Sequence, residues 1–348
     1  MERVGEKTAV LPVVKADAYG HGAVAVARRL ESEGASRFAV AIAEEGIALR
    51  RGGVAGEILL LNHSDPADVP LFRAFGLTPS LYDLVQAKGL AEAAAGRAEP
   101  LAVHLKLDTG MGRMGLRPED LRALAELLLR APGLRLTGTF SNFSSADDPA
   151  SPATDRQMKT MKAALEALRA AGVSAGLVHV ANSAALLTRP DSRFDAVRPG
   201  LSLYGVLPSE SLEGAGLTPA MTLETRVISV RMVPAGTPLG YGERFVTARL
   251  SRIAILPIGY HDGLRRAFSG RVSVLLRGGE APIVGAVSMD LTLVDATETG
   301  AEPGDRAVCL GSEGIRRVTA WDLARAAGTI PYEVLCGIGV RVPRVFLG

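Results

Sequence analysis

The sequence predicts an α/β protein with a parallel (β/α)8 barrel at its amino end and a mainly β domain at its carboxyl end. Short apolar runs alternate with amphipathic helical stretches through the first part of the chain. Polar residues collect where those runs end, as they do at the carboxyl ends of barrel strands. With 348 residues, the chain also exceeds the size at which one hydrophobic core stops growing. Two domains are therefore expected.

The barrel is expected to span residues 1–217. Eight apolar runs predict its strands, at 10–14, 38–41, 58–61, 77–80, 101–107, 134–140, 177–180 and 194–197. The clearest helical patterns between them lie at 23–33, 82–95, 119–130 and 154–171. This alternation favours a closed, TIM-like barrel over a doubly wound open sheet, which usually has fewer strands. No dinucleotide-binding glycine pattern follows the first run.

The second domain is expected to span residues 218–348 and to be mainly β. Its strand patterns lie at 222–233, 253–258, 272–276 and 282–294, with Gly278-Gly279 as a hairpin turn. No comparable helical pattern occurs before 320–327.

Composition excludes several classes of function. The net charge is only +2 and no basic block carries interleaved aromatic residues, so neither a nucleic-acid nor a membrane partner is expected. Cys309 and Cys336 show no metal-ligand spacing. Free thiols, no metal site and a cytoplasmic location are expected. The first residues open no apolar signal segment and mix both signs of charge: Glu2, Arg3, Glu6 and Lys7.

Polar side chains follow five of the eight expected strands. In order along the chain they are Lys15, Asp17, Tyr19 and His21; Lys106, Asp108 and Arg113; Ser141 and Asn142; Asn182 and Ser183; and Arg198 and Gly200. Any one of them is compatible with a solvated loop. Five such clusters at one edge of a barrel indicate an active site.

The segment from Val13 to Gly22 has the order strand, lysine, glycine-containing turn and helix. Partial desolvation of Lys15 at the end of a strand would lower its pKa and leave some of the amine nucleophilic. The alternative is a solvated lysine that only ends the strand. The decapeptide VVKADAYGHG closely resembles the pyridoxal-phosphate lysine motif of the alanine racemase family. The resemblance implies that Lys15 binds pyridoxal phosphate covalently.

The fifth strand alternates so that Lys106 and Asp108 are expected to point into the barrel mouth. His104 lies lower and is interpreted as a hydrogen-bonded core histidine. The glycines of the loop that follows let the backbone approach a ligand closely while Arg113 reaches in. The run 106–115 again resembles alanine racemases. The resemblance implies that Lys106 is carbamylated and holds Arg113, which contacts the cofactor phenolate and the substrate carboxylate.

Phosphate is expected at the loops after the seventh and eighth strands, where barrels usually bind it. Ser183 lies at a helix start, and an ordinary helix N-cap is the alternative for it. By resemblance to the family, Arg198 faces the pyridine nitrogen, which makes the cofactor a weaker electron sink than in aminotransferases. The resemblance assigns the phosphate to Ser183, Gly200, Leu201, Tyr19 and Tyr332.

In the second domain, Tyr241 lies between two glycines. It is either a packed turn residue or a phenol positioned for proton transfer, and it matches the family's second catalytic base. Three further segments match family motifs: 258–260, 288–290, which contains the expected substrate-binding Met289, and 331–336.

Three features depart from the family pattern. Family members usually begin with an extra strand and helix, whereas only fourteen residues precede Lys15. Asn142 stands where a histidine usually stacks on the cofactor, which removes an aromatic contact of about 1 kcal/mol. Ala286 stands where arginine is common, which affects the substrate entrance.

The resemblance implies a racemase that interconverts L- and D-alanine and so supplies D-alanine for peptidoglycan. Lys15 would serve the D enantiomer and Tyr241 the L enantiomer. The family's head-to-tail homodimer, in which Tyr241 reaches the site of the other subunit, is also expected. The alternatives are a racemase of serine or a broader set of small amino acids, a non-racemising pyridoxal-phosphate protein, and a decarboxylase of similar architecture, against which Tyr241 and the 111–113 loop argue.

Overall fold

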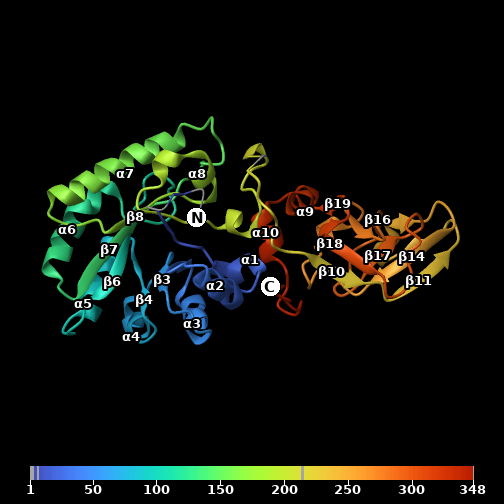
Figure 1. Cartoon of the computed structure of the whole chain (residues 1–348), viewed down its shortest axis with the longest axis horizontal. Coiled ribbons are helices and arrows are strands. Elements are labelled where there is room, and N and C mark those ends of the chain that lie inside the picture. The colour runs from blue at the N-terminus through green and yellow to red at the C-terminus, as the bar shows by residue number, and fades with distance from the viewer. Residues whose placement is uncertain (1–3, 6–7, 213–214, 348) are drawn as a thin grey trace. The chain divides into compact units, whose positions relative to one another are not determined.

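The computed structural model describes residues 4, 5, 8–212 and 215–347 (Figure 1). Glu2, Arg3, Glu6 and Lys7 lie outside the described residues. The chain divides into two compact units. The first comprises Met1–Ala18, Gly22–Leu203 and Leu207–Leu217, and the second comprises Tyr19–His21, Tyr204–Val206 and Thr218–Gly348.

The strands of the first unit form a closed parallel ring. Starting from β1, neighbouring strands in one direction are β1 (Ala9–Val10), β9 (Ala196–Val197), β8 (Leu177–His179), β7 (Leu134–Phe140), β6 (Leu101–Lys106) and β5 (Ser80–Leu81). The rest of the ring is β4 (Leu77–Thr78), β3 (Glu57–Leu60) and β2 (Arg37–Val40). A parallel bridge from Val13 to Ala39 returns the ring to the segment after β1. The predicted eight-stranded barrel is confirmed, with β4 and β5 as one strand interrupted at Pro79.

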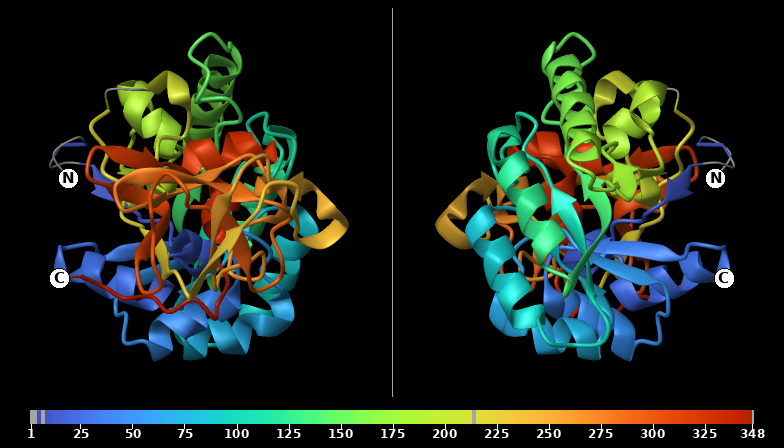
Figure 2. Two further views of the ribbon diagram at one scale, coloured as in Figure 1. Left: turned by 90° about the vertical axis from the view of Figure 1, so that its right-hand side faces the viewer. Right: turned by 90° about the vertical axis from the view of Figure 1, so that its left-hand side faces the viewer.

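Helices follow the strands and cover the outside of this ring (Figure 2). They are α2 (Ala23–Ser32), α3 (Ala43–Arg51), α4 (Val69–Ala74), α5 (Leu84–Ala94), α6 (Leu121–Arg130), α7 (Ala153–Ala170) and α8 (Ser183–Thr188). In α6, Leu121, Leu124 and Ala125 are buried. Their spacing of three and four residues places them on one face of the helix. Among the described residues, no helix is long and apolar enough to cross a bilayer.

A proline explains where the first strand differs from the sequence prediction. The predicted strand 10–14 reduces to the two-residue β1 and the single bridge at Val13. Pro12 lies between them and has no N–H to donate to a neighbouring strand. In contrast, β7 spans residues 134–140 as predicted.

The second unit is built on an antiparallel sheet of eight strands, seven along one path and a short eighth strand, β19, beside it. Its path runs β10 (Leu223–Arg226), β18 (Arg306–Glu313), β15 (Ser273–Leu276), β16 (Gly279–Val284), β17 (Thr292–Asp295), β14 (Ser251–Leu256) and β11 (Ser229–Val233), with β19 (Arg316–Val318) on β18. A separate pair consists of β12 (Pro238–Leu239) and β13 (Phe245–Val246). Helices α9 (Ala320–Ala327) and α10 (Pro331–Cys336) follow. The mainly β character is confirmed.

The hairpin turn between β15 and β16 is displaced by one residue from the prediction. Arg277 and Gly278 have φ of 53° and 75°, whereas Gly279 already begins β16. A two-residue turn with two positive φ values matches the right-handed twist of its strands. The predicted Gly278-Gly279 turn is therefore wrong.

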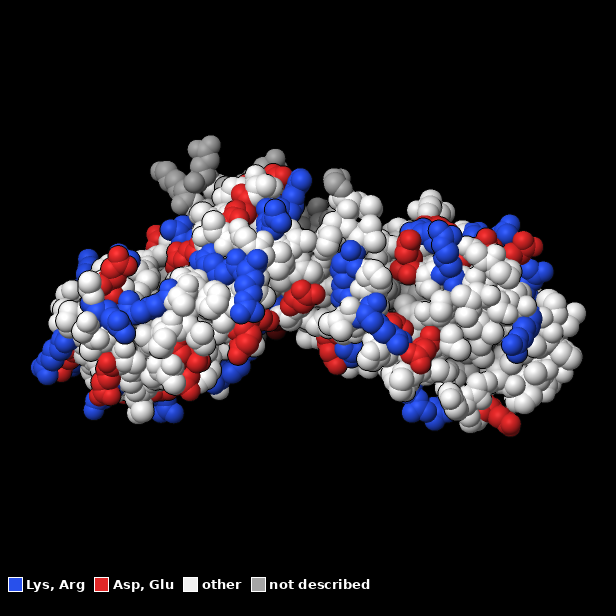
Figure 3. Space-filling model, turned by 90° about the horizontal axis from the view of Figure 1, so that it is seen from below, with Lys and Arg blue, Asp and Glu red and all other residues white. Residues whose placement is uncertain are grey.

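Charged side chains of both signs are interspersed on the face shown in Figure 3. This distribution agrees with the small net charge of +2.

Candidate active site

The segment that begins with Lys15 has an unusual backbone. Helix α1 (Lys15–Gly20) is left-handed, with φ between 51° and 55° from Ala16 to Tyr19. Each non-glycine residue in this conformation costs about 1–2 kcal/mol. Such strain persists only where surrounding contacts hold it, and it clusters at functional sites.

Two carboxylates hold the barrel part of this turn. Glu45, at the start of α3, accepts a hydrogen bond of 2.7 Å from the Ala16 N–H. Asp17 accepts a hydrogen bond of 2.7 Å from the Ala23 N–H through its side chain. Its carbonyl accepts one of 2.9 Å from Gly22. The first turn of the motif is thus tied to both neighbouring helices.

Lys106, the last residue of β6, is buried at the same edge of the barrel. Its Nζ donates a hydrogen bond of 2.7 Å to the Leu61 carbonyl. Burial, and then repulsion by Arg113, Arg198 and Lys15, lowers the pKa of Lys106 to about 8. The strand-end cations predicted from the sequence therefore lie within electrostatic range of Lys106.

The loop after β6 is held by Asp108. Its Oδ1 accepts hydrogen bonds of 2.9–3.1 Å from three consecutive N–H groups, those of residues 110–112. Burial opposes the effect, but these donors lower the pKa of Asp108 overall. A Cβ at Gly115 would collide with the Asp108 backbone. Arg113 is exposed on this loop, so its side chain is available to a ligand.

Arg198 is buried just after β9 and is almost fully engaged. Its Nη1 lies 2.7 Å from His179 Nδ1 and 2.5 Å from the His179 carbonyl. Its Nη2 donates to the carbonyls of Ser141, at 2.5 Å, and Val180, at 3.2 Å. Burial lowers the pKa of Arg198 to about 9. Within the described residues, no acceptor contacts its Nε–H, which leaves that donor for a ligand.

Ser183 connects the loops after β8 and β9. Its Oγ accepts hydrogen bonds from the N–H groups of Gly200, at 2.9 Å, and Ser202, at 3.2 Å. The N-cap of α8 is Asn182, whose side chain accepts a hydrogen bond of 3.0 Å from Ala185. The N-cap alternative for Ser183 is therefore excluded. A hydroxyl and backbone N–H groups converge here, which is the donor set that phosphate binds.

Asn142 lies after β7 and is fixed by the loop around it. Its Nδ2 donates to the Phe143 carbonyl at 2.9 Å, and its carbonyl accepts from Gln157 at the same distance. The side chain is only partly buried.

Three tyrosines meet in the second unit. The ring of Tyr19 lies 5.1 Å from that of Tyr204 and 5.9 Å from that of Tyr332, between ring centroids. Arg344 Nε donates to the Gly20 carbonyl at 3.1 Å. Two of the expected phosphate ligands are thus brought together. Tyr204 also joins this cluster, and no sequence motif marks it.

Tyr241 is exposed at a glycine-flanked turn. Its side chain is 72% accessible, and Gly240 and Gly242 have φ of 74° and 71°. Residue 240 lies beside 285–286, where Ala286 is buried. Met289 is 52% accessible. These large exposed side chains are the kind found at interaction surfaces.

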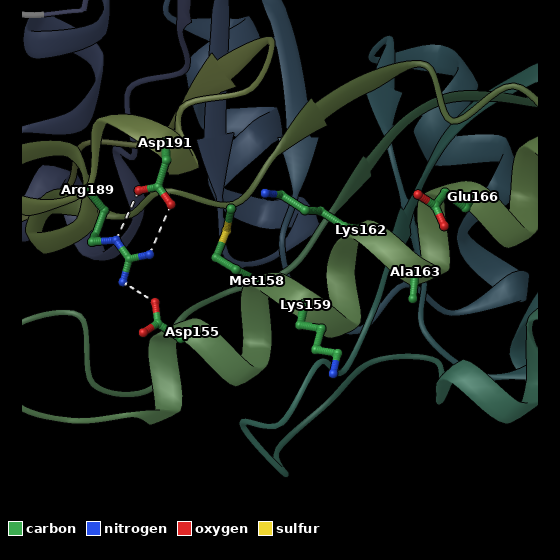
Figure 4. Close-up of a pocket in the computed structure, with 8 residues that line it drawn as sticks. All are labelled: Asp155, Met158, Lys159, Lys162, Ala163, Glu166, Arg189 and Asp191. Carbon is green, nitrogen blue, oxygen red and sulfur yellow. Dashed lines mark hydrogen bonds and ion pairs between the residues drawn. The ribbon is translucent and has the colours of Figure 1, made fainter.

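A separate hollow of about 500 Å3 lies beside α7 (Figure 4). At its edge, Arg189 is bound to Asp155 at 2.7 Å and to Asp191 at 2.9 Å. These ion pairs occupy the guanidinium. The hollow also contains none of the strand-end residues, so it is not the candidate site.

Comparison with known proteins identifies the family. Residues 1–208 match the family described as alanine racemase, N-terminal domain, and residues 220–346 match the alanine racemase, C-terminal domain. The chain belongs to the alanine racemase family. The alanine racemase of Carboxydothermus hydrogenoformans is 41% identical over 350 residues, which cover 100% of this chain and 95% of that protein.

Solved structures of other alanine racemases support this family assignment. The alanine racemase of Bacillus anthracis with bound L-Ala-P has a TM-score of 0.95 at 33% identity, covering 100% of this chain and 90% of that one. The alanine racemase of Streptomyces lavendulae, a producer of D-cycloserine, has a TM-score of 0.95 at 38% identity, covering 100% of this chain and 92% of that one.

The barrel residues form a set that suits the family's cofactor. The set combines an arginine N–H, a serine hydroxyl with backbone N–H groups, and several cations, and so matches a phosphorylated, anionic aromatic ring. His104 is confirmed as a hydrogen-bonded core histidine, because its Nδ1 lies 3.0 Å from His179 Nε2. His179 was not singled out from the sequence. Its position at the end of a strand was the signal that could have identified it.

Proposed function

We propose that the chain interconverts L- and D-alanine, with pyridoxal phosphate bound at the strand-end site of the barrel. The main structural support is the cluster of cations around the buried Lys106, whose pKa is lowered first by burial and then by repulsion from Arg113, Arg198 and Lys15. A cluster of cations at the mouth of a barrel suits a phosphorylated cofactor and a substrate carboxylate. Membership of the alanine racemase family gives the reaction.

Each residue has a proposed task. Lys15 would bind the cofactor covalently, and the Nε–H of Arg198 would be the donor to the pyridine nitrogen. Asn142 would contact the cofactor ring, in place of the usual histidine. Arg113 holds the substrate carboxylate, with Met289 beside the substrate. The phosphate is assigned to Ser183, Gly200, Leu201, Tyr19 and Tyr332.

Pyridoxal phosphate, when bound, acidifies the Cα hydrogen of an amino acid attached to it. Inversion then requires an acid and a base on opposite faces of Cα. The Lys15 amine exchanges the proton of D-alanine, and the Tyr241 phenol exchanges that of L-alanine. The second base comes from the partner subunit of a homodimer. The accessible Tyr241 and Met289 side chains support this arrangement.

Carbamylation of Lys106 is also proposed. A carbamate forms on a neutral amine, and a pKa of about 8 leaves a useful neutral fraction near pH 7. The resulting anion would lie among the cations that now repel the ammonium group. It would thereby orient Arg113.

The cellular role follows from the family. We assign the enzyme to the supply of D-alanine for peptidoglycan. A cytoplasmic location fits the free thiols of Cys309 and Cys336.

Asn142 and the buried Ala286 support a second candidate, a racemase of serine or of several small amino acids. Purified protein with pyridoxal phosphate should be incubated with L-alanine or L-serine, and the D product should be measured. We expect faster formation of D-alanine. Faster formation of D-serine would favour the second candidate, and no D product from either substrate would contradict both.

A further inference from the structure

A chain of polar groups crosses the barrel interior behind Arg198. It begins at Arg198, after β9, and continues through His179 on β8 and His104 on β6 to Glu57, the first residue of β3. Strands in a parallel barrel share one direction, so this chain runs from the carboxyl edge, where the ligand donors lie, to the amino edge. Its successive contacts are 2.7 Å, 3.0 Å and 3.5 Å.

The two histidines in the middle of this series are shielded from solvent. His179 and His104 have accessibilities of 0% and 1%. The Phe140 ring stacks on His179 at 5.1 Å with an interplanar angle of 6°. Buried polar atoms must find partners within the protein. Each imidazole therefore has to present the correct nitrogen to each neighbour.

The two ends of this series of side chains, Arg198 and Glu57, determine which nitrogen of each histidine carries the proton. A guanidinium only donates, so His179 Nδ1 accepts from Arg198 and its proton lies on Nε2. That N–H can be satisfied only if His104 Nδ1 accepts, which places the His104 proton on Nε2 as well. His104 Nε2–H then faces the Glu57 carboxylate, which only accepts. All three contacts agree with one direction of donation.

Charge supports the same direction. Burial and the nearby Arg198 hold the pKa of His179 well below its usual value, so this imidazole is neutral and its Nδ1 can accept. The contact with His104 and the nearby Arg37 lower the pKa of Glu57 despite its partial burial, so the carboxylate is ionised. Arg37 Nε binds the other oxygen of Glu57 at 3.1 Å.

We propose that Glu57 is a positioning residue for the active site: through His104 and His179 it fixes the tautomers that orient the buried guanidinium of Arg198. The hydrogen-bond chain itself does not require a cofactor. Its link to catalysis rests on the proposed function, through Arg198. Loss of these hydrogen bonds and failure of the proposed function can therefore be distinguished.

The decisive variant is Glu57→Gln. An amide offers one acceptor and one donor, and Arg37 competes for the acceptor because it is a charged donor. The amide N–H2 then faces His104 Nε2, which must become an acceptor. His104 then donates from Nδ1 to His179 Nε2, which moves the His179 proton to Nδ1. Two donors, His179 Nδ1–H and an N–H of Arg198, then face each other. The double variant Arg37→Met with Glu57→Gln removes this competition and should restore the original direction.

The first readout is 15N NMR of the histidine rings in the purified full-length chain. The chain has five histidines, which makes assignment practical with variants at His21, His63 and His261. We expect protonated Nε2 and unprotonated Nδ1 for both His104 and His179. In Glu57→Gln, His104 Nε2 should shift toward the unprotonated form, and the double variant should reverse that shift.

The second readout concerns the link to the active site. Glu57→Gln should weaken pyridoxal-phosphate binding and lower kcat/KM about fivefold, the difference expected between a charge-assisted and a neutral hydrogen bond. Glu126→Gln is the control, because it removes a carboxylate from the exposed pair with Arg122 and should change neither readout.

A proton on Nδ1 of either histidine in the wild-type chain would overturn the proposal. Unchanged tautomers in Glu57→Gln would also overturn it. If Glu57→Gln does not fold, cofactor binding of the double variant is compared with that of Arg37→Met alone: the double variant should bind pyridoxal phosphate more weakly, because a neutral amide replaces the carboxylate as the acceptor for His104, and equal binding would overturn the proposal. Altered tautomers with unchanged cofactor binding and kcat/KM would refute only the link to the active site.

Discussion

Lys106→Met is predicted to stabilise the fold and to impair the enzyme. A fall in the pKa of Lys106 from 10.5 to about 8 means that the folded state disfavours the ammonium form by about 3 kcal/mol. Methionine removes this penalty but loses a hydrogen bond to the Leu61 carbonyl, at a cost of about 1 kcal/mol. In buffer freed of carbon dioxide, we expect a net gain of about 2 kcal/mol in the free energy of unfolding at pH 7.

The pH dependence follows from the direction of the shift. The folded chain binds fewer protons than the unfolded chain between pH 8 and pH 10.5, so wild-type stability rises across that interval. Below pH 8 the full penalty is present. The advantage of Lys106→Met should therefore shrink to nearly zero at pH 10.

Urea unfolding at fixed protein concentration measures this effect, with the exposed Lys88→Met as the control. Bicarbonate should stabilise the wild-type chain at pH 7, because carbamylation replaces the buried cation with an anion, and should not stabilise Lys106→Met. Racemase activity of Lys106→Met should fall about tenfold or more, because Arg113 loses the proposed carbamate on Lys106 as its charged partner. Equal destabilisation by Lys106→Met at pH 7 and pH 10 would refute this reasoning.

Three further predictions concern the two bases and the strained turn. Tyr241→Phe should slow Cα proton exchange from L-alanine roughly 100-fold to 10,000-fold more than exchange from D-alanine, as measured in deuterated water. Equal, slight effects on both enantiomers would show that Tyr241 is only a packed turn residue. Co-expressed Lys15→Ala and Tyr241→Phe chains should recover about a quarter of wild-type activity if sites are shared, whereas mixed dimers without activity would rule out sharing. Ala16→Gly should stabilise the fold by about 0.5 kcal/mol, because glycine adopts the positive φ of 51° without strain. The control Ala48→Gly, in the right-handed helix α3, should destabilise the fold by about 1 kcal/mol. If urea unfolding shows that both variants are destabilised, the turn is not strained.

Much of the fold could be predicted from the sequence because hydrophobic periodicity is a local signal. The boundaries of β7 and α9 follow directly from their apolar patterns. The left-handed turn after Lys15 could not be found in this way. Ala16 and Ala18 have no intrinsic preference for positive φ, and contacts with distant residues such as Glu45 impose it.

The strand-end rule identified the residues of the candidate site, but their pairings depend on tertiary structure. Ser183 is a plausible N-cap by sequence, yet Asn182 takes that position and frees the Ser183 hydroxyl to accept from Gly200 and Ser202. Glu57 begins a strand at the opposite edge of the barrel and gave no sequence signal. Its contact with His104 connects it to the site.

The most direct test concerns which lysine holds the cofactor. The structure places both Lys15 and Lys106 in one cationic cluster, and the lowered pKa of Lys106 makes it the chemical rival. The protein should be loaded with pyridoxal phosphate, reduced with borohydride and digested, and the labelled peptides should be identified by mass spectrometry. Label is expected on Lys15. Label on Lys106, or on another lysine, would contradict this assignment.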